Sequence, residues 1–341
     1  MTTFSDRRSQ NLSFLAGLKH LACLFFLMML SAVAFSQPVI PSTLVWDAAP
    51  HNAFTSLVRF EDNFYCAFRE GLSHVDRNGG DDGRIRVLRS SDGHTWEPVA
   101  LLSIKGKDLR DPSLSVTKNG KLSIAVCAAE YHPGATTVYH TYVANFRGRG
   151  FRKLSRVKTG LAREWLWKVH WTDDAAYSFS YTSGFRLMKS KRGRTFSTVC
   201  EYPLADSPSE ADFCIDGQDF VVAVRRDKAP CLIGHGTLAD GRVTWQESDV
   251  YFAGQQLLRL SDGRILLFAR TKNATTGKRE LAAFQYISQD LSKLATFPYR
   301  GDGGYFGAVE TRDSVLVTYY SSHINNRAAI FWTSLSKTLL H

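Results

Sequence analysis

The stretch that decides the fold runs from Ser209 to Arg226 and reads Ser-Glu-Ala-Asp-Phe-Cys-Ile-Asp-Gly-Gln-Asp-Phe-Val-Val-Ala-Val-Arg-Arg. An apolar run leads to the turn Asp216-Gly217, and a second run, rich in valine, follows the turn. Two such runs joined by an Asp-Gly turn predict a β-hairpin. Because a hairpin brings its two open ends together, we expect Glu210 and Arg225 to face each other.

Six turns of this kind occur along the chain, each between two apolar or aromatic runs. They lie 57, 54, 43, 46 and 50 residues apart, and they begin at Asp62, Asn119, Asp173, Asp216, Asp262 and Arg312. A period near fifty residues with several short strands per repeat indicates a propeller. No long amphipathic helix interrupts the pattern. The sequence therefore predicts an all-β fold, a six-bladed β-propeller of four-stranded antiparallel blades.

The first 36 residues are separate from the repeat and have the features of an export signal. Basic residues precede an apolar region from Leu21 to Phe35, and small residues stand at Ala34 and Ser36. This order is typical of a signal peptide, and the apolar region is short for a membrane span. We expect cleavage near Ser36 and a secreted or periplasmic protein without a membrane span. Residues 37–341 then form a single domain, because no linker rich in Pro, Gly or Ser divides the repeat.

The composition restricts the partners and cofactors of the protein. The chain has 42 Lys and Arg residues against 32 Asp and Glu, a formal net charge of +10, which favours anionic partners. The basic residues from Arg147 to Lys158 carry no nucleic-acid motif, so we interpret them as a solvated edge and expect no nucleic-acid partner. Five cysteines follow residue 36 without metal-ligand spacing. We expect buried thiols, no metal and no cofactor.

A short turn motif recurs in three of the repeats. It is most complete as Ser90-Ser-Asp-Gly-His-Thr-Trp96 and returns in degenerate form at 190–196 and 240–245. Asp and Gly make the turn, and the final aromatic residue packs beneath it. The motif resembles the Asp-box of sialidase-type propellers, one residue short of that family's pattern. The resemblance supports the fold and implies nothing about catalysis.

In such a propeller the starts of the first strands and the ends of the second strands of all blades meet at one mouth. The side chains expected there are arginines, carboxylates and aromatic residues: Arg69, Glu70, Arg110, Asp111, Glu164, Trp165, Glu210, Asp212, Arg225, Arg226, Gln255, Arg270, Tyr305 and Tyr319, with His74 and Asp76 from a neighbouring loop. Clustered arginines bind carboxylates bidentately, so the set predicts recognition of an anionic ligand. The alternative is that these arginines form ion pairs between neighbouring blades.

Several of these positions resemble the active site of exo-sialidases and sialidase-like glycoside hydrolases. The resemblance makes Tyr305, in Gly-Gly-Tyr-Phe-Gly, the nucleophile and Glu210 its base. It implies that Arg225 and Arg270 bind a substrate carboxylate and that Arg69 lies near the substrate's hydroxyls. The family's acid lies on the loop of the first blade, where Asp76 is our first candidate and His74 the second. Further candidate substrate contacts from the mouth are Arg110, Asp111, Glu164, Trp165 and Gln255.

The chemistry of an acidic sugar explains these residue types, and one departure from the family's pattern limits the substrate. A carboxylate on the anomeric carbon repels a carboxylate nucleophile, whereas a neutral tyrosine activated by a glutamate can attack. The first arginine of the family's carboxylate-binding triad is absent, because His51-Asn-Ala-Phe54 stands at its place. Arg110 is a candidate replacement. We therefore expect an acidic sugar other than sialic acid, or a neutral one.

The sequence thus predicts a monomeric, secreted exo-glycoside hydrolase of the sialidase type that removes a terminal, acidic sugar from a glycan. Two alternatives remain open. A non-catalytic glycan-binding propeller needs only arginines and aromatic contacts. A polysaccharide lyase on the same scaffold uses a tyrosine and a histidine to remove a proton beside a uronate carboxylate, which leaves an unsaturated product.

Overall fold

A computed structural model describes residues 37–75, 83–132 and 134–340. The expected signal peptide, residues 1–36, and the candidate acid Asp76 lie outside the described residues. Pro38–His341 form one compact unit. The described part of the chain contains no helix with the length and apolar character of a membrane span.

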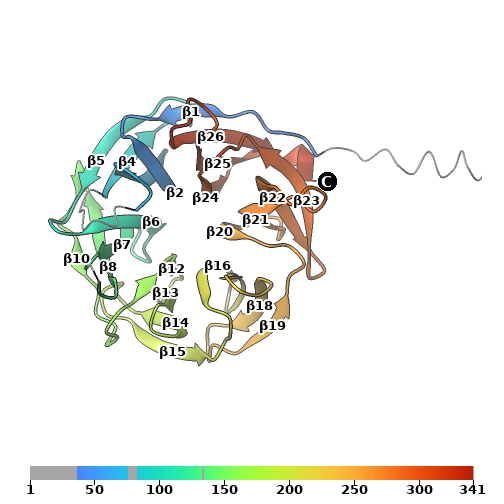
Figure 1. The fold of residues 1–341 in the computed structure, drawn as a ribbon. Helices are drawn as coiled ribbons and strands as arrows, with labels where there is room; N and C mark the ends of the chain where they lie inside the picture. Colours follow the sequence, from blue (N-terminus) through green and yellow to red (C-terminus); the bar gives the residue numbers. More distant parts are fainter. Residues whose placement is uncertain (1–36, 76–82, 133, 341) are drawn as a thin grey trace, which may run out of the picture. The chain divides into compact units, whose positions relative to one another are not determined.

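Six antiparallel sheets surround a common centre and follow one another in chain order (Figure 1). In blades 1 to 5 the first strand of the sheet lies nearest the centre and the last lies at the outside, whereas in the sixth sheet β24 (Gly303–Glu310) is innermost and β1 (Thr43–Trp46) outermost (Figure 1). This arrangement confirms the predicted six-bladed β-propeller. All six predicted turns join the first and second strands of a blade.

The first three blades differ in how regular their strands are. Blade 1 contains β2 (His51–Phe60), β3 (Asn63–Gly71), β4 (Arg84–Ser90) and β5 (Glu97–Leu102). Blade 2 contains β6 (Asp108–Val116), β7 (Leu122–Glu130), β8 (Val138–Arg147), β9 (Gly150–Phe151) and β10 (Ser155–Arg156). Blade 3 contains β11 (Trp165–Leu166), β12 (His170–Trp171), β13 (Ala176–Tyr181), β14 (Phe185–Ser190) and β15 (Ser197–Tyr202). In blade 3 the innermost strand is divided into β11 and β12, which both pair with β13.

The last three blades are regular four-stranded sheets, and the chain ends in a short 3-10 helix. Blade 4 contains β16 (Pro208–Asp216), β17 (Asp219–Arg226), β18 (Leu232–Thr237) and β19 (Val243–Glu247); blade 5 contains β20 (Ala253–Arg259), β21 (Ile265–Lys272), β22 (Arg279–Ile287) and β23 (Asp290–Phe297); blade 6 contains β24 (Gly303–Glu310), β25 (Ser314–Ser321), β26 (Ala329–Ser336) and β1 (Thr43–Trp46), followed by η1 (Lys337–Leu340).

The N-terminal strand β1 closes the ring by completing blade 6. Thr43 pairs with Trp332 and Leu44 with Phe331, so two segments from opposite ends of the chain share one sheet. This pairing covers the outer edge of β26, whose backbone groups would otherwise lack partners. The sequence pattern did not predict it, because the repeat spacing contains no information about which ends of the chain pair.

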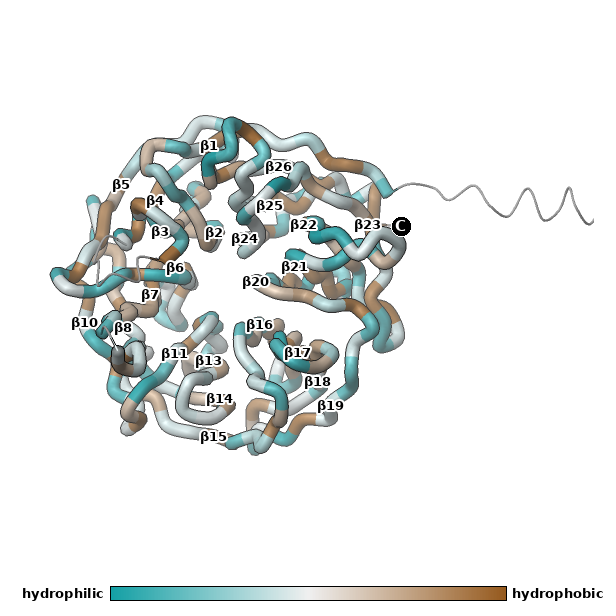
Figure 2. Tube along the Cα trace, in the orientation of Figure 1, coloured by the Kyte–Doolittle hydropathy of each residue, from teal (hydrophilic) through white to brown (hydrophobic). Residues whose placement is uncertain are grey.

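The hydrophobic core lies between neighbouring blades rather than at the centre of the ring. Each of six apolar clusters joins two adjacent sheets; blades 5 and 6, for example, share Phe268, Phe306 and Tyr319, all with no exposed surface. Apolar segments accordingly recur in every blade (Figure 2). Because burial of these faces drives folding, polar residues can occupy the centre.

The innermost strands carry β-bulges at corresponding positions. In five of the six described innermost strands the register shifts near the start of the strand. The bulged residues have left-handed backbone angles: Phe54 (φ 64°), Asp111 (φ 44°), Glu210 (φ 36°), Gly254 (φ 57°) and Tyr305 (φ 52°). A bulge re-aims a side chain out of the normal alternation of a strand. The bulges therefore supply residues of the candidate active site.

Candidate active site

Tyr305 and Glu210 form the central contact of the mouth. Tyr305 Oη donates a hydrogen bond of 2.5 Å to Glu210 Oε1. Arg225 Nη1 donates to the same oxygen at 2.7 Å, and the backbone N–H of Gly254 donates to Glu210 Oε2 at 2.7 Å. Both oxygens of the glutamate are thus held in place. The expected contact between Glu210 and Arg225 is present, although the strand register pairs Arg225 with Ser209, because Glu210 occupies the bulge.

The tyrosine is half-buried among aromatic rings and faces one arginine. Its ring centroid lies 4.9 Å from that of Phe54 and 5.7 Å from that of Trp167, and the Arg270 guanidinium lies 5.7 Å above the ring. Burial raises the pKa of Tyr305 well above its usual range, the negative charge of Glu210 adds to this effect, and Arg270 opposes it. Tyr305 is therefore a neutral phenol at rest and needs a base to become a nucleophile.

Gly254 makes room for this tyrosine. A Cβ added at Gly254 would lie 2.7 Å from Cδ2 and 2.8 Å from Cγ of the Tyr305 ring. The same residue has a left-handed backbone and donates its N–H to Glu210. A residue without a side chain is thus required both by the backbone angle and by the ring that packs on it.

We expect Gly254→Ala to lower kcat by about 10- to 100-fold, because a displaced tyrosine loses its alignment with Glu210. Steady-state kinetics on a cleaved aryl glycoside would measure this. Gly263→Ala is the matched control, because Gly263 also has a positive φ (91°) but its Cβ would meet nothing nearer than 3.9 Å. Equal kinetic losses in both variants would show that backbone strain alone, and not the position of Tyr305, is responsible.

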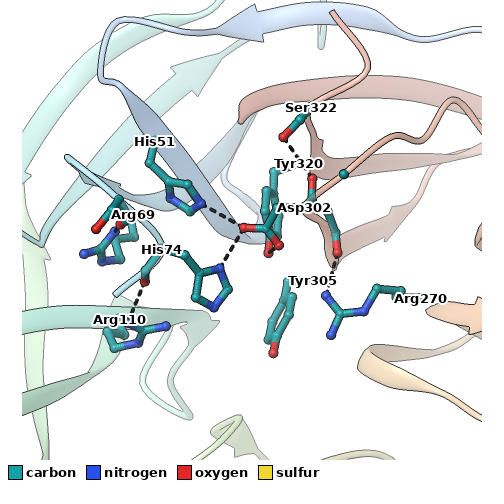
Figure 3. A network of polar contacts seen from close by, with 12 residues as sticks. His51, Arg69, His74, Arg110, Arg270, Asp302, Tyr305, Tyr320 and Ser322 are labelled. Carbon is teal, nitrogen blue, oxygen red and sulfur yellow. Dashed lines mark hydrogen bonds and ion pairs between the residues drawn. The ribbon is translucent and has the colours of Figure 1, made fainter. Parts of the chain in front are cut away.

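A second cluster joins blades 1 and 6 beside Tyr305 (Figure 3). Asp302 Oδ2 contacts His51 Nε2 at 2.9 Å and His74 Nδ1 at 2.7 Å, and Tyr320 Oη donates to Asp302 Oδ1 at 2.9 Å. Burial alone would raise the pKa of Asp302, but the hydrogen bonds from the two histidines outweigh it and hold this pKa well below its usual range. Asp302 is therefore an ionised carboxylate that orients His74.

Sequence reasoning missed Asp302 and the role of His51. Asp302 directly precedes the Gly-Gly-Tyr segment that opens β24, and that proximity to the proposed nucleophile was the available signal. The ligating atoms of His51, His74 and Asp302 lie within 4.8 Å of one another, so this trio is the group in the described residues that could hold a metal ion. Hydrogen bonding within the trio already gives each of these atoms a partner.

Asp111 is a second buried carboxyl of the site, besides Glu210. Its Oδ1 has no hydrogen-bond partner among the described residues, and its Oδ2 lies 3.9 Å from Arg110 Nε. Burial raises the pKa of Asp111 to about 7, the charge of Glu210 adds to this shift, and Arg110 and Lys168 oppose it. Near neutral pH the carboxyl is thus poised between its two protonation states.

We expect Asp111→Asn to stabilise the protein at pH 8 and to change its stability little at pH 4. The pKa is raised on folding, so between about pH 4 and 7 the folded state keeps a proton that the unfolded chain has lost, and stability falls as the pH rises through that window. Asparagine has no charge to desolvate. Urea unfolding at both pH values should show a gain of about 1–3 kcal/mol at pH 8 only. A variant less stable than the parent at pH 8 would contradict the raised pKa.

The four arginines expected to bind substrate divide into two groups. Arg69 has no exposed surface and its Nε donates to Asp108 at 2.7 Å, while Arg110 is almost buried and donates to Asp108, Tyr131 and the backbone O of His74. Arg69, which has no exposed surface, therefore holds Asp108 instead of contacting substrate as expected. Arg110 lines a pocket with Tyr131 and Tyr139, and its contact with substrate stays a prediction. Arg225 and Arg270 lie beside Tyr305; among the described ion pairs, Arg225 has the partners Glu210 and Asp227, and Arg270 has none.

Two other expected substrate contacts, Glu164 and Gln255, have internal roles, whereas Trp165 stays partly exposed. Glu164 has no exposed surface and accepts a hydrogen bond of 3.1 Å from the Thr141 N–H. Gln255 also has no exposed surface, and its amide donates to the backbone oxygens of Glu210 and of Ala223. Trp165 is half-buried and stacks on Tyr181, with centroids 5.4 Å apart. Glu164 and Gln255 thus position neighbouring strands instead of reaching the mouth.

Three solved structures with a similar architecture are named as enzymes that act on sugars. A sialidase from Trypanosoma rangeli superposes with a TM-score of 0.64 at 11% identity, over 90% of this chain and 60% of that one. An α-L-arabinofuranosidase from Fusarium graminearum (TM-score 0.59, 9% identity) and an α-L-arabinanase from Penicillium chrysogenum (0.56, 10%) each match over 88% of this chain and 98% of their own. The chain thus spans about three-fifths of the sialidase's length. No protein-family model and no curated sequence matches. At these identities the likeness establishes the shared fold.

Proposed function

We propose that this protein is an exo-glycoside hydrolase in which Tyr305 is the nucleophile and Glu210 its base. The observation that carries the proposal is the 2.5 Å hydrogen bond from Tyr305 Oη to a glutamate held on both oxygens, at the mouth of a fold shared with glycoside hydrolases. A phenol next to a positioned carboxylate is the arrangement that nucleophilic catalysis by tyrosine requires. A purely structural Tyr–Glu pair would not need two arginines beside it.

In the first step Tyr305 Oη attacks the anomeric carbon while its proton passes to Glu210 Oε1. The bond from that carbon to the leaving oxygen breaks, and this oxygen takes a proton from an acid. In the second step water attacks the same carbon and gives a proton to the former acid. Tyr305 then leaves the sugar and recovers its proton from Glu210, so atoms and protons balance over the cycle.

We assign the acid to His74, which the sequence offered together with Asp76. Asp302 accepts a hydrogen bond from His74 Nδ1 at 2.7 Å, which leaves Nε2 to carry the transferable proton. His74 is about half exposed and its ring lies 5.2 Å from Phe54, which in turn contacts Tyr305. Asp76 lies outside the described residues, two positions after His74, and remains the alternative acid.

The arginines favour an acidic terminal sugar as the substrate. Arg270 lies over Tyr305 without a carboxylate partner among the described ion pairs, so a carboxylate on the sugar would complete its pairing beside the reacting carbon. At the place of the family's first arginine the protein has His51, which contacts Asp302 together with His74. A single substrate carboxylate therefore fits this mouth.

We also propose that the protein acts outside the cytoplasm after removal of residues 1–36.

A polysaccharide lyase is the second candidate, because a positioned histidine and a tyrosine share the mouth. In that reaction the pair would remove a proton beside a uronate carboxylate and release the leaving oxygen by elimination. The contacts from His74 to Phe54 and from Phe54 to Tyr305 bring the two residue types together. The products distinguish the two reactions, since hydrolysis adds water and elimination creates a conjugated double bond.

The test is to incubate the protein with acidic oligosaccharides and with aryl glycosides of acidic and neutral sugars in water enriched in heavy oxygen. A reducing sugar that contains the heavy oxygen supports hydrolysis. An unsaturated product without it supports the lyase. Binding of a glycan without turnover of any substrate would indicate the glycan-binding propeller.

With His74→Ala, turnover should fall for substrates with poor leaving groups and much less for substrates with activated aryl leaving groups, because only poor leaving groups need the acid.

A further inference from the structure

The positive charge of the protein is concentrated in two neighbouring blades. Residues 112–200, which hold most of blades 2 and 3, contain fifteen of the 42 Lys and Arg residues but only four of the 32 Asp and Glu. This segment is therefore +11, and the rest of the chain is −1. Between Glu130 and Glu164, and again between Asp174 and Glu201, there is no acidic residue at all. Such an asymmetry creates a strong local field that attracts anions.

The outer edge of blade 2 carries the first part of this charge. Six basic side chains on and between β8, β9 and β10 are all exposed: Arg147, Arg149, Arg152, Lys153, Arg156 and Lys158. None of them takes part in an ion pair among the described residues. Ordinary surface lysines and arginines alternate with carboxylates that screen them. Here that screening is missing over a continuous edge.

A groove between the turns of blades 2 and 3 carries the second part. It has a volume of about 470 Å³ and is lined by Lys118, Lys121, Lys191, Arg192 and Arg194, together with amide and hydroxyl side chains such as Asn119 and Asn145. Lys118 Nζ donates to the backbone O of Asp174, and no described ion pair includes any of these five cations. Amides and hydroxyls beside cations are the groups that bind sugar rings bearing acidic substituents.

The edge and the groove form one surface. The Lys158 N–H donates to Arg194 O at 2.8 Å, and the Phe196 N–H donates to Lys158 O at 2.8 Å. On the other side of the groove the Arg152 N–H donates to the backbone O of Asn145, a groove residue, at 3.0 Å. We call this surface, residues 117–121, 145–158 and 191–194, the basic face. Its turns lie at the strand ends opposite the mouth.

We propose that the basic face binds an anionic polysaccharide and holds the protein on it while the mouth remains free. Charge complementarity and the polar lining of the groove favour this ligand. The exposed large apolar side chains of the described chain, such as Leu72 and Ile287, all lie outside the basic face, so it has no group to insert into a membrane. Trp171 is the aromatic residue lining the groove, and its ring packs against Gly193. The proposal does not depend on the reaction at the mouth.

The test compares binding of the protein to immobilised heparin and polygalacturonate with binding of two triple variants of equal charge. The groove variant is Lys191→Gln/Arg192→Gln/Arg194→Gln. The control is Arg59→Gln/Arg242→Gln/Arg312→Gln, three exposed residues outside the basic face. We expect the parent to bind one of these polysaccharides, with an affinity that falls as the salt concentration rises. The groove variant should lose about tenfold or more in affinity, and the control variant less than about twofold.

Three results would overturn the proposal. In the first, the parent binds neither polysaccharide. In the second, the two variants lose affinity equally, which would indicate that net charge alone is responsible. In the third, anionic phospholipid vesicles or DNA bind more tightly than the polysaccharides, with the same dependence on the groove residues. Circular dichroism should show that both variants fold, since all six substituted side chains are exposed. Turnover of a small aryl glycoside should be unchanged in both, which separates a failure of this proposal from a failure of the proposed reaction.

Discussion

Tyr305→Phe is expected to lower kcat by about 1,000-fold or more, because it removes the oxygen that attacks the sugar. Phenylalanine keeps the ring that packs against Phe54, Trp167 and Gly254, so the fold and the substrate affinity should change little. Glu210→Gln should cause a loss of similar size, since the amide cannot take the proton from Tyr305. Single-turnover kinetics on an aryl glycoside would measure both effects.

The double variant provides the internal check. Two residues that act as one unit give losses that do not add, so Tyr305→Phe/Glu210→Gln should be about as slow as either single variant. Tyr320→Phe is the matched control, since its ring centroid lies 6.1 Å from that of Tyr305 and its hydroxyl binds Asp302 instead of Glu210. If Tyr305→Phe retains most of the activity, the nucleophile is another residue and the proposed mechanism is wrong.

Asp108→Ala is expected to destabilise the fold by about 3–5 kcal/mol, because it removes a fully buried carboxylate from an ion pair with a fully buried arginine. Asp108 and Arg69 both have no exposed side-chain surface and are joined at 2.7 Å, and Asp108 also accepts hydrogen bonds from Arg110 and Tyr131. Urea unfolding monitored by tryptophan fluorescence would measure the loss. Asp240→Ala, which breaks an exposed pair with Arg242, should cost much less than Asp108→Ala.

The same substitution should also disturb the site from a distance. Arg69 Nη1 donates to the backbone O of Ser73 at 2.7 Å and Arg110 Nη1 to that of His74 at 2.9 Å, so the two arginines anchor the loop that presents His74. Even below the unfolding transition we therefore expect lower activity on poor leaving groups. A variant as stable as the parent would mean that the network relaxes around the lost carboxylate and does not hold the loop.

The repeat and the turns were predictable because their signals are local. A short polar turn between two apolar runs, which is Asp-Gly or Asn-Gly in three of the six cases, is read from a few neighbouring residues, and the six turns all join the expected strands. The turn at Asp92 has the predicted construction, since its Oδ1 accepts the N–H groups of His94 and Thr95 at 2.8 Å. By contrast, β1 could not be predicted, because its partner β26 lies at the other end of the chain.

The candidate site was only partly predictable. Tyr305, Glu210 and Arg225 were identified from one hairpin and one short motif, and the structure brings them together. Arg69 was placed at the mouth by strand position and by the family resemblance, and Glu164 by strand position, but neither side chain has any exposed surface. Strand position indicates which end of a blade a residue occupies, but not whether a neighbouring carboxylate draws the side chain inward.

By itself, the sequence determined the repeat, the number of blades, the end of the ring where chemistry-bearing residues collect, and the excess of basic charge. These properties depend on turn chemistry, on alternation of apolar residues and on composition, all of which are local. Only the tertiary structure decided which side chains meet: the left-handed bulges at Glu210 and Tyr305, the gap left by Gly254, and the joining of His51, His74 and Asp302. Such contacts join residues far apart in the chain, and their geometry follows from the packing of whole blades, which no local pattern specifies.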